Sequence, residues 1–489
     1  MGEELSLFRA DFNGSLRIES REERITGDSG AILLREVLER LGLGRWIERR
    51  LFDPRNPDLI THPQIELVNT SLLLLAQGWR DQDDADLLRD DPVFRLAVSK
   101  RRGIGPLKMR PREEGKPLNP NPVVPDGLAS QPTLSRLVRV LAMDENRRVL
   151  RESLLEAAAR RVKSMRGGHR PRYVTIDVDS LPVEVHGHQP GSEHNGHYHA
   201  RIYHPLVASA GELGDLLDVR LCPGNAHTAE GALEFILPLL DRVERKLCQV
   251  ASVRIDAGFP NDELLSALEA RGTPYVARVK NNAVLNRMAE PQLKRPVGRP
   301  PAEPRTWMYE MSYRAEPWSR ARRVVLVVLE RPGELFLHHF FLITNWTVEQ
   351  MDGESLLDLY RQRGTAEGHY GELSGVLDPA LSSAPRPKTH YRGQELTRRY
   401  RSANSFLINE ALLLLNALAY NIAHAARAIM EVATGEGWSL RRFRERVLRT
   451  AARVLIHGRR AILILGHISG AYWPAILPHL RKLQFADLE

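Results

Sequence analysis

The sequence has little of what an extracellular or membrane protein needs. Cysteine is nearly absent, since Cys222 and Cys248 are the only two in 489 residues. Two are too few for a disulfide framework, and their scarcity fits a reducing cytosol. The N-terminal stretch is acidic and mixed and has no apolar signal segment. The most apolar window, 406–425, is interrupted by Asn409, Glu410, Asn416, Asn421 and His424. We therefore expect a buried helix there and no membrane span.

The composition is that of a globular protein with an excess of positive charge. Hydrophobic residues make up 43% of the chain and charged residues 27%, which is ordinary for folded domains. The length allows two to four domains, and we find no internal repeat. Lys and Arg together number 69 against 61 for Asp and Glu, a net charge of +8. The excess is mostly arginine, which suits phosphate recognition, so the balance points to a polyanion partner.

The order of expected elements predicts an α/β architecture. The pattern of alternation and turn residues predicts five strands, at 173–179, 198–209, 216–222, 252–256 and 275–280. Helices are expected between the last three of them, at 228–246 and 262–271, where Asn261 can cap and Gly272 can terminate the second helix. Three further strands, at 307–314, 322–330 and 335–344, precede a helix at 355–373. Strands that alternate with helices in this way favour a layered α/β fold.

Acidic residues at the ends of two expected strands are the strongest chemical signal. In the strand at 173–179, Asp177 and Asp179 alternate with apolar residues and so project from one face. Two carboxylates on one face repel each other unless a cation lies beside them, and a divalent metal is the obvious candidate. Asp256 ends the fourth strand, so it would meet Asp179 at one sheet edge if the two strands are neighbours. The alternative is an exposed strand end with solvated carboxylates.

A third acid lies on a later helix. Tyr360, Arg363 and Glu367 fall at i, i+3 and i+7 of the helix expected at 355–373, so they share one helical face. A solvated face that carries an ordinary Arg–Glu pair is the alternative interpretation.

The combination of these residues is more specific than any one of them. Asp179, Asp256 and Glu367, in this order of elements, resemble the catalytic triad of DDE transposases. Tyr360-x-x-Arg363-x-x-x-Glu367 resembles the Y-x2-R-x3-E signature of insertion-sequence transposases that carry a β insertion before the glutamate. Other stretches are similar to the thirteen-eighty group of insertion sequences, over most of the chain from about residue 25: Leu88-Arg-Asp-Asp-Pro92, Ser130-Gln-Pro-Thr-Leu-Ser-Arg136, His186-Gly187, Asn195-Gly196, Pro223-Gly-Asn225, Arg254-Ile-Asp-Ala-Gly-Phe259 and Thr344-Asn345.

The resemblance implies an α/β RNase-H-like catalytic core, with a mixed five-stranded sheet, helices and an inserted β subdomain, between helical N-terminal and C-terminal regions. The expected divisions are a helical DNA-binding region with a proline-rich linker at 1–128, a helical connector at 129–172, the first part of the core at 173–282, the β insertion at 283–350, the second part of the core with the glutamate helix at 351–402, and a helical region at 403–489.

The resemblance also implies the chemistry. The enzyme would cleave DNA strands at the ends of an insertion sequence and transfer them into target DNA, using two Mg²⁺ ions, or Mn²⁺ in their place, held by Asp179, Asp256 and Glu367. Its partners would be double-stranded DNA, in the form of terminal inverted repeats and target, and a second copy in a homodimeric synaptic complex. The expected location is the bacterial cytoplasm, at the nucleoid. We expect DNA contacts from six residues: Tyr360, Arg363, Arg136, Lys280, Lys388 and Arg392.

The sequence departs from the family pattern in one respect and leaves one choice open. The signature continues with a lysine, but the nearby positions here are Gly371 and Ser374, so Lys388 or Arg392 would have to replace its phosphate contact. Periodicity cannot choose between Asp177 and Asp179 as the first acid. The family pattern of an acid followed by a small hydroxyl residue favours Asp179, and Asp177 remains the alternate.

Two other functions compete with this interpretation. One is a catalytically inactive DNA-binding relative of a transposase. The other is a zinc-dependent hydrolase that uses the histidines between His186 and His204, namely those at 186, 188, 194, 197, 199 and 204.

Overall fold

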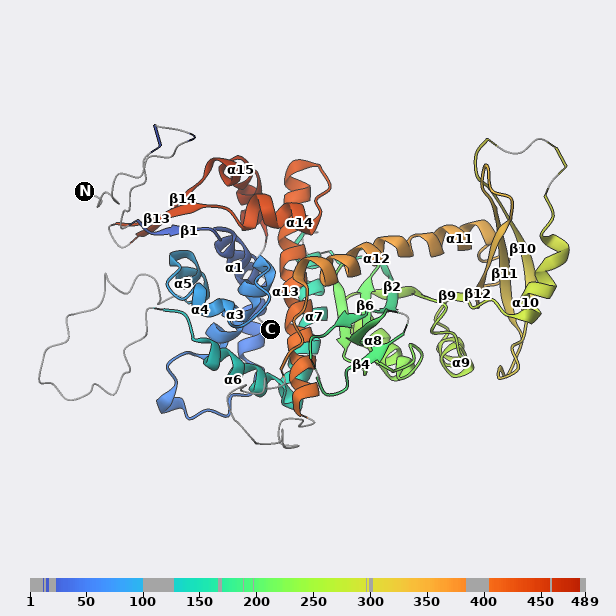
Figure 1. Cartoon of the computed structure of the whole chain (residues 1–489), viewed down its shortest axis with the longest axis horizontal. Helices are drawn as coiled ribbons and strands as arrows, with labels where there is room; N and C mark the ends of the chain where they lie inside the picture. The colour runs from blue at the N-terminus through green and yellow to red at the C-terminus, as the bar shows by residue number, and fades with distance from the viewer. Residues whose placement is uncertain are drawn as a thin grey trace, which may run out of the picture. The chain divides into compact units, whose positions relative to one another are not determined.

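The computed structural model describes residues 12, 15–16, 23–99, 127–165, 169–187, 189–196, 198–295, 297–298, 302–383, 404–457 and 460–483. Lys388, Arg392, His188, His197 and most of the expected proline-rich linker lie outside the described residues. The chain forms two compact units (Figure 1). One comprises Met1–Leu38, Arg55–Leu137 and Ala426–Lys482, and the other Glu39–Pro54, Val138–Ala425 and Leu483–Glu489.

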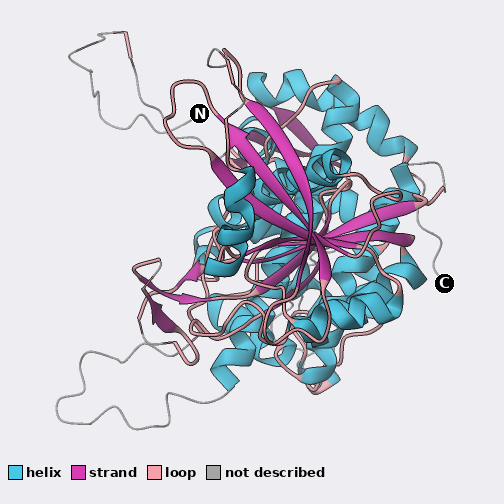
Figure 2. Ribbon diagram, turned by 90° about the vertical axis from the view of Figure 1, so that its right-hand side faces the viewer, coloured by secondary structure: helices cyan, strands magenta, loops and turns pink. Residues whose placement is uncertain are grey.

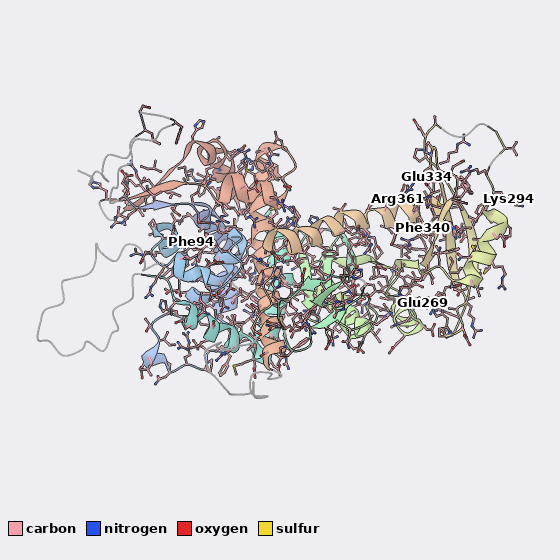
Figure 3. The ribbon with its side chains drawn as sticks, in the orientation of Figure 1. Phe94, Glu269, Lys294, Glu334, Phe340 and Arg361 are labelled. Carbon is pink, nitrogen blue, oxygen red and sulfur yellow. The ribbon has the colours of Figure 1, made fainter. Side chains whose placement is uncertain are left out.

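The first unit is mostly helical. Its elements include α1 (Gly30–Arg40), α3 (Gln64–Gln77), α4 (Asp84–Leu87), α5 (Pro92–Val98), α6 (Gln131–Leu141), α14 (Leu440–Phe443) and α15 (His467–Lys482). Asp91 caps α5 by accepting from the amides of Val93 and Phe94, each at 2.9 Å. The same helix buries the ring of Phe94, which is labelled in Figure 3.

The expectation of an all-helical C-terminal region is wrong. β13 (Ala452–His457) and β14 (Arg460–Leu465) form an antiparallel hairpin, and β1 (Ile25–Thr26) pairs with β13. Ala452 and Val454 are buried and Arg453 and Leu455 exposed, which is the two-residue period of a half-buried strand. Arg453 and Arg460 lie on the solvent side of the hairpin, whereas Arg441, Arg442 and Arg446 are exposed on α14 and the helical turn that follows it.

The second unit is organised around an eight-stranded mixed sheet in the order β10-β11-β12-β9-β8-β2-β6-β7. Figure 2 shows its strands fanned out by the twist of the sheet. The strands are β2 (Tyr173–Ser180), β6 (Leu206–Ala210), β7 (Leu216–Arg220), β8 (Gln249–Ile255), β9 (Tyr275–Val279), β10 (Arg305–Tyr313), β11 (Arg322–Glu330) and β12 (His338–Thr344). β2, β8 and β9 are parallel to one another, and every other pairing in the sheet is antiparallel.

The sheet is larger than the five strands expected, because the strands of the expected insertion belong to it. β12 pairs with β9 from Phe341↔Val279 to Thr344↔Val276. Without this pairing β9 would be an edge strand with unpaired backbone groups. The strand expected at 198–209 is also two strands, because Pro205 lies between β5 (Ala200–Tyr203) and β6 and has no N–H for a ladder. β5 joins a small sheet with β3 (Val183–Glu184) and β4 (Glu193–Asn195).

Helices cover both faces of the large sheet. Val174, Ile176 and Val178 of β2 pack in one apolar cluster with α7 (Asp144–Met165), α8 (Ala232–Lys246), α9 (Asp262–Arg271) and α10 (Ala283–Ala289). On the opposite face, Val276, Val325 and Leu342 pack with Leu356 and Leu357 of α11 (Gly353–Arg361). α12 (Arg363–Glu372) follows α11 in nearly the same line (Figure 1). The face that carries the sheet's polar residues is therefore beside α11 and α12.

α13 (Asn404–Thr434) is long and apolar enough to span a membrane by length and composition, but 78% of its most apolar window is buried. Its Asn421 bonds to the sheet of the second unit. Asn421 accepts from the amide of Leu216 at 2.9 Å and donates to the carbonyl of Leu216 at 2.8 Å. The side chain thus satisfies the backbone of edge strand β7, as the expected buried helix requires.

Candidate active site

The three parallel strands of the large sheet have their carboxyl ends on the same side of it, and acidic residues lie there. Val178 of β2 is in register with Ile255 of β8, so Asp179 and Asp256 are the next residues along these two neighbouring strands. Lys280 follows β9, the parallel neighbour of β8, at the same edge, and it is exposed. The condition for the two acids to meet, that the first and fourth expected strands are neighbours, holds, because β2 pairs with β8.

Local hydrogen bonds orient the two aspartates. Oδ1 of Asp179 accepts from the backbone N–H of Ser180 at 2.9 Å. Oδ1 of Asp256 accepts from the backbone N–H of Gly258 at 2.7 Å, which closes a tight turn after β8. A Cβ on Gly258 would lie 3.0 Å from the Cβ of Thr228. A side chain at this position would crowd Thr228, so the turn after Asp256 favours glycine.

The third acid is connected to the first through an arginine. Arg363, in the first turn of α12, donates from Nη2 to Oδ2 of Asp179 and from Nη1 to Oε1 of Glu367. The side chains of Arg363 and Asp179 are only 13% and 16% exposed, whereas Glu367 is 55% exposed. One guanidinium thus lies between the carboxylates of Asp179 and Glu367. The third carboxylate, that of Asp256, is close enough to help raise the pKa of Arg363.

The crowding of these carboxylates has an electrostatic consequence. Burial raises the pKa of Asp179 to about 6, against the lowering effects of Arg363 and of the Ser180 N–H. The charges of Asp256 and Glu367 also contribute to this raised value. A buried carboxylate beside two others is stabilised by any cation that enters the cluster, and here that cation is the guanidinium of Arg363.

Asp177 has a different environment from Asp179, although both lie on the same strand. It is 1% exposed, and both its carboxylate oxygens accept from Arg254 of β8, Oδ1 from Nε at 2.6 Å and Oδ2 from Nη2 at 2.7 Å. Its carbonyl accepts from the hydroxyl of Tyr370 at 3.0 Å. Because the carboxylate of Asp177 is already shared with Arg254, the geometry favours Asp179 as the first acid.

Tyr360 lies on the side of α11 that faces the acids. It is half-buried, and its pKa is raised by burial, lowered by Arg363 and raised again by the charges of Asp256 and Glu367. Arg278 of β9 also acts on it, and the Arg278 guanidinium lies 5.3 Å from the ring centre of Phe340, which Figure 3 labels. The phenol and two cationic groups therefore flank the acid cluster.

The other residues expected to contact DNA are dispersed. Arg136 is exposed on α6, in a segment assigned to the first unit. Ser374, which stands near the position of the family's lysine, donates its hydroxyl to the carbonyl of Tyr370 at 3.1 Å. It is therefore used within its own helix.

The histidines do not form a metal centre in the part of the chain that the structure describes. His186, His194 and His199 are exposed and His204 is half-buried. Among the described residues, no three His, Cys, Asp or Glu side chains gather in a group that could hold a metal ion. The zinc-hydrolase alternative therefore gains no support from the described histidines. Asp179 and Glu367 both bond to the guanidinium of Arg363.

The structure adds three residues that the sequence interpretation missed. Burial and the charges of Asp179 and Asp256 raise the pKa of Tyr198, so this tyrosine lies near the two acids. Its ring lies edge-on to that of His204, with 6.2 Å between the ring centres. Arg254 and Tyr370 hold Asp177. Spacing could have revealed both, because Arg254 precedes Asp256 by two residues on a strand and Tyr370 follows Glu367 by three on a helix.

One comparison with known proteins gives a family. The family model described as transposase DDE domain group 1 matches residues 8–378. No curated protein matches the chain. Among solved structures the chain is similar to the cryo-EM structure of a piggyBac transposase synaptic complex with hairpin DNA, at 12% identity over 92% of this chain and 81% of that chain. The TM-score is 0.41, which does not by itself establish a shared fold.

Proposed function

Because the chain belongs to the family of the transposase DDE domain, group 1, we propose that it cleaves DNA at the ends of an insertion sequence and transfers the strands into target DNA. One observation carries the proposal: Asp179 and Asp256 follow neighbouring parallel strands at one sheet edge, and Arg363 joins Glu367 to Asp179. The three acids come from distant parts of the chain, and one guanidinium bridges two of them. The family and this arrangement support the same reaction.

The proposal includes an RNase-H-like core. Strands β7-β6-β2-β8-β9 form five adjacent strands in which the first three in chain order, β2, β6 and β7, are antiparallel and the last two are parallel to β2. This arrangement supports such a core, with β10, β11 and β12 added at its β9 edge. The insertion would then extend the sheet beside the helix that carries the glutamate.

The three acids have the chemistry to hold divalent ions, although among the described residues they do not gather in a group that could hold one. Asp179, Asp256 and Glu367 offer hard oxygen ligands of the kind that Mg²⁺ and Mn²⁺ prefer, and a positive charge already lies between two of them. When bound, such ions would activate the attacking oxygen and stabilise the leaving oxygen. Arg363 would then be released from the carboxylates and free to hold a phosphate through two parallel N–H donors.

The chain's own cationic and phenolic groups would position the DNA. Tyr360 would orient the phosphate nearest the acids, and Lys280, at the same sheet edge, would contact the backbone beyond it. Arg136, Lys388 and Arg392 would contribute further phosphate contacts. The partners would be double-stranded terminal repeats and target DNA, bridged by a homodimer, in the bacterial cytoplasm at the nucleoid.

The test is DNA cleavage. A labelled duplex that carries the element's terminal repeat is incubated with Mg²⁺ or Mn²⁺ and with wild type, Asp179→Asn, Asp256→Asn or Glu367→Gln. Asp358→Asn, an exposed acid of α11, is the matched control. We expect the three variants to bind the duplex but to cut it about 10³-fold more slowly, since metal-assisted charge stabilisation supplies several kcal/mol.

The same experiment separates the alternatives. If Asp177→Asn is inactive and Asp179→Asn active, the first acid is Asp177. Binding without cutting by wild type, with either metal, would leave the protein as a non-catalytic DNA-binding relative of a transposase. Cutting that depends on Zn²⁺ and on His186 would favour the hydrolase.

A further inference from the structure

Arg254 is a fully buried arginine in the middle of the large sheet. It lies on β8 in register with Asp177 of β2 and is 1% exposed. Its Nε and Nη2 donate to the two oxygens of the Asp177 carboxylate at 2.6 and 2.7 Å. This fork-to-carboxylate geometry fixes the plane of the guanidinium, and so it fixes where the third nitrogen points.

The third nitrogen reaches the junction between α11 and α12. Nη1 donates to the carbonyl of Leu359 at 2.8 Å and lies 3.4 Å from Oε1 of Gln362. The helix breaks at Gln362, which ends α11 and precedes α12. Carbonyls in the last turn of a helix need donors from elsewhere, and Arg254 supplies one. The bonded carbonyl is one residue before Tyr360 and four before Arg363.

A second contact holds the other end of the same segment. Tyr370, one turn after Glu367, donates its hydroxyl to the carbonyl of Asp177 at 3.0 Å and lies 2.8 Å from the hydroxyl of Ser209. The helix that carries Arg363 and Glu367 is therefore attached to Asp177 both before and after these residues. One attachment runs through the side chain of Arg254, and the other ends on the backbone of its partner Asp177.

The pair has no room to move. A Cβ on Gly211 would lie 2.5 Å from Nη2 of Arg254 and 2.7 Å from Oδ2 of Asp177, so the backbone of Gly211 packs directly on the ion pair. Tight packing of this kind transmits position from the sheet to the helix. Stability alone is a weak explanation for the pair, because apolar residues of similar volume commonly replace buried ion pairs at no cost.

We propose that Asp177 and Arg254 are positioning residues: they set the α11–α12 junction and thereby place Tyr360, Arg363 and Glu367 against Asp179 and Asp256. This inference rests on the proposed function of those acids. The pair itself touches neither DNA nor metal. A shift of the junction by about 1 Å would be enough to lower the cleavage rate about 10²-fold.

Two variants separate positioning from stability. Arg254→Lys keeps the charge but cannot grip both Asp177 oxygens and also reach Leu359. The double variant Asp177→Leu/Arg254→Met removes both charges and keeps the volume, so it leaves no unpaired buried ion. Arg322→Lys is the matched control, because Arg322 is equally buried but pairs with Asp262 and Glu269 of α9.

We expect the double variant to bind the terminal-repeat duplex within about threefold of wild type and to cut it about 10²-fold more slowly in a single turnover. Arg254→Lys should behave in the same way, and Arg322→Lys should cut at the wild-type rate per folded molecule. If the double variant is as stable as wild type and cuts at the wild-type rate, the pair is only structural and the inference is overturned.

Amide hydrogen exchange tests the positioning without cleavage. Residues 363–372 should exchange faster in the double variant than in wild type, whereas the amides of β8 and β9 should keep their protection. Unchanged exchange in α12 overturns the inference, whatever the activity. If wild type never cuts DNA but exchange in α12 responds to the pair, the proposed function fails while the positioning role is retained.

Discussion

Replacing Asp179 by asparagine should stabilise the folded protein at neutral pH while abolishing cleavage. The carboxylate is held in a partly dehydrated place beside two others, and burial raises its pKa from 3.8 to about 6. A metal-binding site requires a carboxylate of this kind. Its ionisation destabilises the folded protein in the empty site, and a bound cation offsets that free energy. Asparagine removes the charge and keeps one acceptor oxygen, whereas Asp179 uses Oδ1 for the Ser180 N–H and Oδ2 for Arg363.

The magnitude follows from the pKa. A difference of one pKa unit is worth about 1.4 kcal/mol, so ionised Asp179 costs the folded state up to roughly 3 kcal/mol. Between pH 3.8 and about 6 the folded state binds more protons than the unfolded state at this site. The stability that Asp179 contributes is therefore present in full below pH 3.8, declines as pH rises through this window and is lost above about 6. The gain in Asp179→Asn should be near zero at pH 4 and reach its full value by pH 7 to 8.

Urea unfolding at pH 4, 5, 6, 7 and 8, with a chelator present, measures the gain. Asp358→Asn, an exposed acid on α11, serves as the control and should show no such pH dependence. Added Mg²⁺ should reduce the difference, since it stabilises only the wild type. A variant that is no more stable than wild type at pH 8, or equally stabilised at every pH, would refute the reasoning.

Three further outcomes are expected. Arg363→Gln should bind Mn²⁺ more tightly than wild type in the absence of DNA, because the guanidinium no longer competes for two carboxylates; a titration followed by electron paramagnetic resonance checks this, and weaker binding would contradict it. Tyr370→Phe should lose about 1–2 kcal/mol of unfolding free energy, because it removes the buried hydroxyl that bonds to Asp177 and Ser209; unchanged urea unfolding would count against those bonds. Gly211→Ala should lose about 1–3 kcal/mol, since its Cβ would lie 2.5 Å from a guanidinium nitrogen; a fully stable variant would show that the ion pair can yield.

Local features of the fold could be predicted from the sequence because their causes are local. Asn261 caps α9 by accepting from the amide of Leu264, and Gly272 ends it at φ 74°, as the residue types predict. The apolar alternation of β2 and the helical character of 355–373 are read in the same way, although the structure divides that segment into α11, with Tyr360, and α12, with Arg363 and Glu367. Hydrogen bonds and side-chain periods within a few residues decide such elements.

Membership of the sheet could not be predicted, because it depends on strands far apart in the chain. Three strands after the Pro-rich segment have the pattern of a separate subdomain, and only the pairing of β12 with β9 shows that they complete one sheet. The hairpin of β13 and β14 was missed for a related reason. Its arginines face solvent on a strand, and charge by itself does not distinguish an exposed helix face from an exposed strand face.

The sequence by itself determined which residue types are candidates for the chemistry: two strand-end acids, one helical acid and an arginine four residues before it. Only the tertiary structure gave Asp177 and Asp179 different partners. Period-two geometry sends both to the same face, but the register of β2 with β8 sets Arg254 opposite Asp177, whereas Asp179 follows the last residue of β2 that pairs with β8 and lies beside Arg363. Which partner lies across the sheet from a carboxylate depends on strand register, which is a property of the fold.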